Sequence, residues 1–156
     1  MEVSEVKITA SEVLPLLPYK FEVVIQKPYG KVFLLPDESI LICELTKQYV
    51  PIEQFKEIFT EIKPFIEQFG IRKFVFDKQN LRVFHQPSME WYFVSWKEEM
   101  YRKGLSVHRK VLPQDQPAFN LAVEAGRAKI LAEYKESIIH RLDIQYKASV
   151  QEAIES

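Results

Sequence analysis

The stretch Ile71–Gly104, IRKFVFDKQNLRVFHQPSMEWYFVSWKEEMYRKG, decides the fold of this chain. It begins with a predicted strand, Arg72–Asp77, whose apolar residues fall on both faces. Such a strand is typical of the middle of a sheet that is covered on both sides. A polar turn then leads into a predicted aromatic helix, Pro87–Lys103, which Gly104 ends. A strand followed directly by a helix predicts a βαβ unit, and we expect the rest of the chain to pack on it.

Strands and helices alternate on both sides of this unit. The pattern predicts further strands at Phe21–Gln26, Val32–Leu35, Ile40–Leu45, Ser106–Pro113 and Arg141–Lys147, and helices at Pro51–Phe69 and Ala118–Tyr134. Ser149 and Glu152 form a capping-box pair that opens a short last helix. The order predicts an α/β (α+β) fold, a mixed sheet of about five to six strands with helices packed against it.

Several local features refine this prediction. Residues 1–156 are expected to form one domain, in which 1–19 is an N-terminal arm lying on the rest. The pattern leaves the pairing of the first strand open. Pro64 should kink its helix or split it in two, since proline removes a backbone donor. Gly126 lies within an apolar helical stripe, which indicates a close approach of that helix to the sheet. His108, Arg109 and Lys110 interrupt the Ser106–Pro113 strand and favour a position near the sheet edge.

Composition excludes several classes of protein. Lys and Arg number 21 against 22 Asp and Glu, a net charge of −1, which argues against a general nucleic-acid binder. Cys43 is the single cysteine and lies within a predicted buried strand, so neither an internal disulfide nor a zinc set is expected. With no leader-like start and no run of about 18 apolar residues, we expect a cytoplasmic protein without a membrane span.

Cofactor and metal sites find no support in the motifs. His85, His108 and His140 are scattered, without metal-ligand spacing. The four glycines stand singly, so no glycine-rich loop is present to hold a phosphate. The prediction is therefore a protein without cofactor or metal.

Four polar residues bracket the turn at the carboxyl end of the central strand: Asp77, Asn80, Arg82 and His85. Ligands of open α/β sheets favour that edge. An aspartate and a histidine there could form a base and its orienting partner, whereas turn and cap roles are the simpler interpretation.

A second polar group is basic and comprises Arg102, Lys103, His108, Arg109 and Lys110. It could form a patch for an anion. A solvated helix end is the simpler interpretation, because positive charge suits a helix C-terminus.

The aromatic helix is apolar on two sides. Met89, Phe93, Trp96 and Met100 share one narrow face that should point into the core. The side chains that lie away from this face are Trp91, Val94 and Tyr101. They form either an interface, most simply with a second copy of the chain, or a set of surface residues in which the tryptophan folds over a neighbouring loop.

The order of several segments resembles a known family. These segments are Asp37–Leu45, the helix up to Gly70, RKFVFDKQNLRVF, the pair Glu90-Trp91, GLSVHRKVLP and SVQEAIES. Together they resemble small bacterial SpoIIAA-like proteins, relatives of the STAS (anti-sigma factor antagonist) and SEC14/CRAL-TRIO-like domains that are frequent in Bacteroidetes. The resemblance covers roughly residues 36–156.

The resemblance implies a SpoIIAA-like fold and, for most members, no established activity. STAS antagonists carry a phosphorylated serine where the helix after the central strand begins, and Ser88 is the nearest match by position, although the small-residue pattern around it is absent. The expected function is a non-enzymatic regulatory or protein-interaction domain, acting as a homo-oligomer. The alternative, by analogy with the SEC14-like relatives, is a binding protein for a small apolar or lipid-like ligand.

Overall fold

The computed structural model describes residues 8–156, so residues 1–7 of the predicted N-terminal arm lie outside the described part. Six strands form one sheet in the order β1-β2-β3-β4-β5-β6. The strands are β1 (Glu22–Lys27), β2 (Gly30–Leu35), β3 (Ile40–Leu45), β4 (Lys73–Asp77), β5 (Val107–Val111) and β6 (Asp143–Lys147). The pairs β1–β2 and β2–β3 are antiparallel, and the following pairs are parallel. The predicted mixed sheet of an α/β fold is confirmed.

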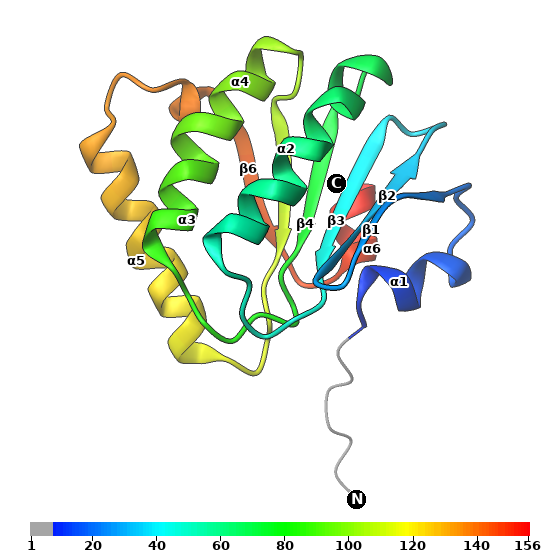
Figure 1. Ribbon diagram of the computed structural model, residues 1–156, viewed down its shortest axis with the longest axis horizontal. Helices are drawn as coiled ribbons and strands as arrows, with labels where there is room; N and C mark the ends of the chain where they lie inside the picture. Colours follow the sequence, from blue (N-terminus) through cyan, green and yellow to red (C-terminus); the bar gives the residue numbers. More distant parts are fainter. Residues whose placement is uncertain (1–7) are drawn as a thin grey trace, which may run out of the picture.

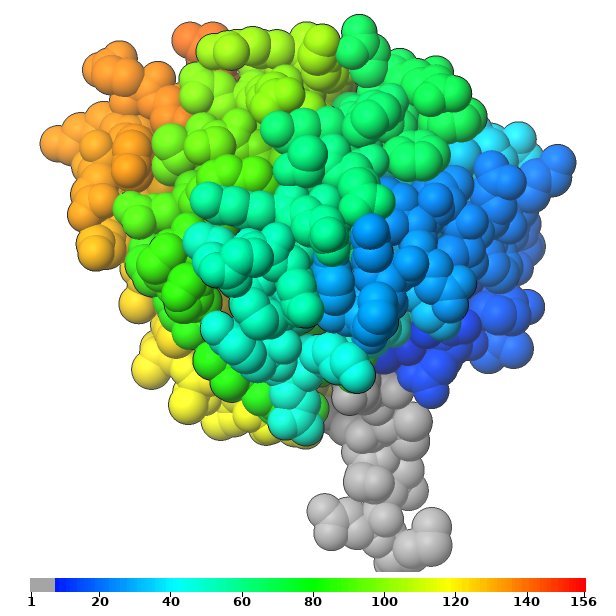
Figure 2. Space-filling view, in the orientation of Figure 1, coloured from blue at the N-terminus to red at the C-terminus, as the bar shows by residue number. Residues whose placement is uncertain are grey.

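Helices cover both faces of this sheet. The segments are α1 (Ala10–Val13), η1 (Leu14–Leu16), α2 (Ile52–Gln68), α3 (Gln86–Glu90), η2 (Trp91–Trp96), α4 (Lys97–Arg102), α5 (Pro117–Glu133), η3 (Ile138–Arg141) and α6 (Val150–Glu155). Helices α2 to α5 lie in front of the sheet, whereas α6 lies behind it (Figure 1). Their side chains close the front face, and the β1–β2 hairpin, in blue, reaches the right-hand margin (Figure 2).

The central strand β4 is buried on both sides, as predicted. Phe74 and Phe76 belong to the core cluster under the front helices, and Val75 belongs to the cluster on the opposite face. All three side chains are essentially inaccessible to solvent. Because successive strand residues point to opposite faces, this one strand contributes to both cores.

The back of the sheet is covered by three short helical segments, α1, η1 and α6. Ala10 of α1 and Leu14 of η1 pack in the same cluster as Val150 and Ile154 of α6. Thr9 and Glu12 form a capping box that starts α1, a signal that the sequence analysis did not use. The described part of the arm therefore fills the second core.

The aromatic helix is one continuous helical rod with a π-helical turn in its middle. The turn, η2, separates α3 from α4. All four predicted core residues are buried, which confirms that face: Met89, Phe93, Trp96 and Met100. The indole Nε1 of Trp96 donates a hydrogen bond to the Phe59 carbonyl oxygen at 2.7 Å, which ties the rod to α2.

Prolines and glycines act largely as expected. Helix α2 runs unbroken past Pro64, so this helix is not split in two there. Gly70 and Gly104 have φ angles of +58° and +102°, the left-handed conformation that ends a helix at little steric cost. At Gly126, a Cβ atom would lie 2.6 Å from the Phe84 Cζ. The close approach is to the start of the aromatic helix and the segment before it, so the predicted approach to the sheet is wrong at this position.

The predicted exposure of the basic residues on β5 is wrong. His108, Arg109 and Lys110 are buried, and β5 lies inside the sheet between β4 and β6. Arg109 is tolerated because neighbouring oxygens surround its guanidinium group, while His108 and Lys110 face the front helices. The interpretation as part of a solvated helix end is therefore wrong for all three of these residues.

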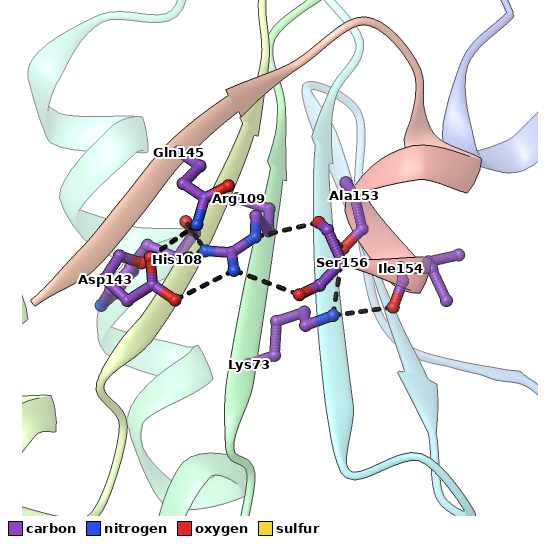
Figure 3. A network of polar contacts seen from close by, with 8 residues as sticks. All are labelled: Lys73, His108, Arg109, Asp143, Gln145, Ala153, Ile154 and Ser156. Atoms are coloured by element: carbon purple, nitrogen blue, oxygen red, sulfur yellow. Dashed lines mark hydrogen bonds and ion pairs between the residues drawn. The ribbon is translucent and has the colours of Figure 1, made fainter.

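Arg109 anchors α6 to the back of the sheet (Figure 3). Its Nε donates to the Ser156 Oγ at 3.0 Å and an Nη donates to the Asp143 carboxylate at 3.0 Å. Lys73 donates to the carbonyl oxygen of Ile154 at 2.7 Å. Cations at the end of α6 suit the partial negative charge of a helix C-terminus. The network explains why charged residues occur in two interior strands.

The last strand lies at the sheet edge and is preceded by a 3₁₀ segment, η3, that the pattern did not predict. The predicted cap of α6 is confirmed, because the Ser149 Oγ accepts a hydrogen bond from the Glu152 backbone N–H at 3.1 Å. Cys43 is buried on β3, also as predicted. Within residues 8–156, none of the helices has the length and apolarity that crossing a bilayer requires.

Candidate functional site

A small pocket opens at the carboxyl ends of β3 and β4. Its cavity volume is about 50 Å³. Leu45 and Phe76 come from the strands, and the front helices close the sides. The other apolar lining residues are Val50, Phe55, Leu81, Val83, Phe84, Met89, Tyr92, Phe119 and Val123. The polar lining consists of Lys78, His85 and Ser88. This edge is where open α/β sheets bind ligands.

Lys78 is the cation of the pocket. It directly follows β4, and its backbone N–H donates to the Val111 carbonyl oxygen at 2.8 Å, which fixes the residue at the strand end. Its side chain is 7% exposed, with the Nζ 4.9 Å from the centre of the Phe76 ring. No ion pair joins Lys78 to a carboxylate within residues 8–156. Burial lowers the pKa of Lys78 to about 8.

His85 and Ser88 meet at the pocket wall. The His85 Nδ1 lies 2.8 Å from the Ser88 Oγ and accepts a hydrogen bond from the Ser88 backbone N–H at 3.3 Å. The histidine is therefore the N-cap of α3. Ser88 could also be interpreted from the sequence as a residue that helps to cap the helix or as an exposed residue of its first turn. Both interpretations are wrong, because the residue is 6% exposed and His85 occupies the cap position. A kinase would reach Ser88 only after the start of α3 moved.

Asp77 lies on the other side of the sheet from this pocket. It shares the back face with Val75, and its Oδ2 accepts a hydrogen bond from the Ala10 backbone N–H at 2.8 Å. Its Oδ1 accepts from Gln79. Burial raises the pKa of Asp77 to about 6, although the donated hydrogen bonds oppose this shift. Glu44 accepts similarly from the Ser11 backbone N–H at 2.7 Å, so the two carboxylates hold α1.

Asn80 and Arg82 order the loop that closes the pocket. The Asn80 amide donates to the Leu45 carbonyl oxygen at 3.1 Å. Arg82 donates to the Gln79 and Leu81 carbonyl oxygens and lies 3.8 Å from the Asp115 carboxylate. Of the four polar residues predicted at this edge, the structure therefore brings His85 into the pocket and gives Asp77, Asn80 and Arg82 other partners.

The three residues predicted as an interface are half-buried. Trp91 packs against Phe55 of α2, with ring centres 6.1 Å apart, and the Lys56 Nζ lies 5.7 Å above the indole. Val94 packs against the front core. Tyr101 is partly exposed on α4. One interpretation of the sequence was that Trp91 folds over a neighbouring loop. In the structure it packs on the neighbouring helix α2 instead.

Sequence reasoning missed Lys78, the first residue after the central strand. Its position at the carboxyl edge was a usable signal, and the period of two places it on the face of Phe74 and Phe76. Within residues 8–156, no group of three or more His, Cys, Asp or Glu side chains is placed to hold a metal ion.

Comparison with known proteins gives no further identification. No family model matches the chain, and no curated protein matches it significantly. The functional argument therefore rests on the pocket and on the buried charges around it.

Proposed function

We propose that this chain is a binding protein for a small ligand with an apolar body and an anionic group, held in the pocket beside Lys78. This develops the alternative from the sequence, a protein for a small apolar ligand. The observation that carries it is the buried Lys78 ammonium group, which lines an otherwise apolar pocket and has no carboxylate partner within residues 8–156.

Charge favours an anion over a neutral ligand. Burying an ammonium group is unfavourable unless an acceptor or an opposite charge accompanies it. The ring of Phe76 offers a partial substitute through a cation–π contact. A ligand carboxylate would add a charge-assisted hydrogen bond, a stronger interaction. The Ser88 hydroxyl at the same wall offers a further polar contact.

Size restricts the apolar body to a few carbon atoms. A cavity of about 50 Å³ accommodates roughly three or four water-sized groups. The three carbon atoms beyond the carboxylate of butyrate match this volume, with the carboxylate itself placed against Lys78 at the pocket wall. A long lipid chain would require Phe84, Met89 or Phe119 to move.

We expect butyrate to bind with a dissociation constant on the order of 1 mM, while butan-1-ol, its neutral counterpart, binds more weakly. Lys78→Met should weaken butyrate binding at least about tenfold, because the charge-assisted hydrogen bond is lost. Butan-1-ol binding should change little. Isothermal titration calorimetry at pH 7 measures both ligands.

Lys56→Met serves as the matched control, since it removes a lysine that also lies above an aromatic ring but outside the pocket. Hexanoate and octanoate extend the series and show where the gain in affinity per methylene stops. Butyrate affinity should also fall as the pH rises above about 8, where Lys78 loses its proton in the free protein. Equal affinities for butyrate in the wild type and in Lys78→Met would contradict the proposal.

Self-association stays a prediction, and its support is the half-buried surface formed by Trp91, Val94 and Tyr101. As a SpoIIAA-like interaction domain the chain would be a homo-oligomer at tens of micromolar. The variants Trp91→Ala and Tyr101→Ala would each reduce the molar mass of the particles in solution toward that of the monomer. Light scattering measures this directly. A monomer at that concentration, with both variants unchanged, would count against the interface. We likewise propose kinship with SpoIIAA-like proteins, regulation at Ser88 and a cytoplasmic location.

A further inference from the structure

Two side chains at the wall of the pocket beside Lys78 have the arrangement of a nucleophile and its base. The Ser88 Oγ lies 2.8 Å from the His85 Nδ1, within reach for a proton transfer. Both residues line the pocket, so a molecule inside it contacts them. Holding a carboxylate requires neither residue to act as a base. Their pairing therefore goes beyond what ligand binding needs.

The hydrogen bonds around His85 fix the form of its ring. The Ser88 backbone N–H donates to the Nδ1 at 3.3 Å, so this nitrogen carries a lone pair and the proton of the neutral ring is on the Nε2. The Ser88 hydroxyl is then the donor in the shorter contact with the same nitrogen. A serine O–H that points at an unprotonated imidazole nitrogen can pass its proton to the ring when the oxygen attacks a substrate.

Local structure holds the pair in place. His85 is the N-cap of α3, with extended backbone angles of φ −132° and ψ 106°. Pro87 lies in the first turn, where its fixed φ suits a helix start, and the Met89 backbone N–H donates to the His85 carbonyl oxygen at 3.2 Å. The helix continues through η2 and α4. Base and nucleophile therefore lie at the start of a long helical rod, which positions them more precisely than a loop would.

The pocket also supplies a cation for the charge that an attack by the serine creates. Addition of the Ser88 oxygen to an ester carbonyl group turns the carbonyl oxygen into an oxyanion. Lys78 lines the same cavity of about 50 Å³ and forms no ion pair with a carboxylate within residues 8–156. Apolar side chains make up most of the remaining wall, and low polarity strengthens the attraction between an ammonium group and an oxyanion.

The shape of the pocket separates an acyl chain from its leaving group. Phe76 and Tyr92 line the pocket and are each only 1% exposed, so they form its closed end. Val83 also lines the pocket but is 50% exposed, so it marks the mouth. A short acyl chain fills the closed end, and the alcohol part of the ester leaves past Val83.

We propose that Ser88 and His85 catalyse the hydrolysis of esters of short-chain carboxylic acids in this pocket. The His85 Nδ1 takes the hydroxyl proton while the Ser88 Oγ bonds to the carbonyl carbon. The ester C–O bond breaks, the alcohol leaves with the proton from His85, and the acyl group stays on Ser88. A water molecule then gives a proton to His85 and attacks the acyl group. Ser88 regains its proton and the carboxylic acid is released.

This inference rests on the proposed function, because the carboxylate that Lys78 binds becomes the product of the reaction. The same ammonium group faces the oxyanion before hydrolysis and the carboxylate after it. Lys78→Met should therefore lower kcat/KM for the ester at least about tenfold, alongside its effect on butyrate binding.

Turnover of p-nitrophenyl butyrate, followed by the release of p-nitrophenolate, tests the pair. Ser88→Ala should lower kcat/KM at least about 100-fold. His85→Asn should do the same, because asparagine caps a helix well but does not accept the proton. Ser137→Ala is the matched control and should keep the wild-type rate. Ser137 and His140 are also three residues apart, but the His140 Nε2 lies 3.1 Å from the Tyr134 carbonyl oxygen.

The acyl group on the serine can be detected directly. Wild-type protein quenched with acid early in the reaction should carry a butyryl group on the peptide that contains Ser88, as identified by mass spectrometry. Ser88→Ala should carry none on that peptide. Because the acyl group is sought in the wild type, this measurement does not depend on the folding of a variant.

Calorimetry with butyrate separates this inference from the binding function. If the wild type binds butyrate but hydrolyses the ester no faster than Ser88→Ala and carries no acyl group, hydrolysis is wrong and the binding function stands. If butyrate does not bind, the binding function is wrong, and with it the role of Lys78 in holding the product. An acyl group on a residue other than Ser88 would overturn the assignment of the nucleophile.

Discussion

Trp96→Ala should lower the free energy of unfolding by about 3–5 kcal/mol, the range for large aromatic residues deleted from a core. The side chain is fully buried, with ring centres 5.1 Å from both Phe59 and Phe74. Truncation also leaves the Phe59 carbonyl oxygen without its indole donor. This residue joins α2, β4 and the aromatic rod, so its loss weakens all of their packing.

Trp91→Ala provides the matched control, because the second tryptophan lies on the same rod but is half-buried. Its truncation should lower the free energy of unfolding by about 1–2 kcal/mol, in proportion to the smaller buried area. Urea denaturation followed by far-UV circular dichroism measures both variants. Similar losses for the two would contradict the placement of the rod.

Lys78→Met should raise the free energy of unfolding by about 3 kcal/mol at pH 7, and the gain should disappear toward pH 10.5. The pKa of Lys78 is about 8 in the folded protein against an ordinary value of 10.5. Between these pH values the unfolded chain holds a proton that the folded chain has released. The free energy of unfolding of the wild type therefore rises with pH through this window. Lys78→Met has no group to titrate at this position, so its free energy of unfolding does not show this rise.

The difference between wild type and Lys78→Met contains the titration of Lys78 and a smaller contribution from Lys97 and Lys110, because the positive charge of Lys78 helps to lower the pKa of both. Urea denaturation at pH 7, 8, 9 and 10 gives the profile. Lys56→Met should show a pH profile parallel to that of the wild type. A difference between wild type and Lys78→Met that stays constant with pH would mean that the lysine is hydrated in the folded state.

The fold was largely predictable because local patterns and tertiary structure agree. The strand at Lys73–Asp77 is apolar on both sides and lies in the middle of the sheet, and the apolar stripe of α2 faces the core. Gly70 and Gly104 end helices as their conformational freedom suggests. A fold can be predicted from a sequence when the local patterns of strands, helices and helix ends agree with the tertiary packing, as they do here.

The candidate sites were less predictable, because burial of charge depends on tertiary contacts. A strand carrying His108, Arg109 and Lys110 reads as half-exposed, yet α6 and the aromatic rod cover it from two sides. Lys97 falls four residues after Phe93, on the predicted core face, and that spacing was the available signal. Its charge argued against burial.

Strand parity also explains the error of grouping Asp77 with His85. Adjacent residues at a strand end point to opposite faces, so Asp77 reaches α1 behind the sheet and Lys78 reaches the pocket in front. The four polar residues are close in sequence and follow the same end of β4, but they do not all lie on the same face of the sheet. A parity argument from Phe74 and Phe76 would have selected Lys78.

The most direct test of the central claim is to locate bound butyrate on the protein by NMR. A methyl-resolved titration of the wild type should shift the signals of Leu45, Met89 and Val123, which line the pocket, and saturate with the dissociation constant found by calorimetry. Lys78→Met should show these shifts only at much higher concentrations. Shifts scattered over the surface, or none at these three residues, would contradict the account.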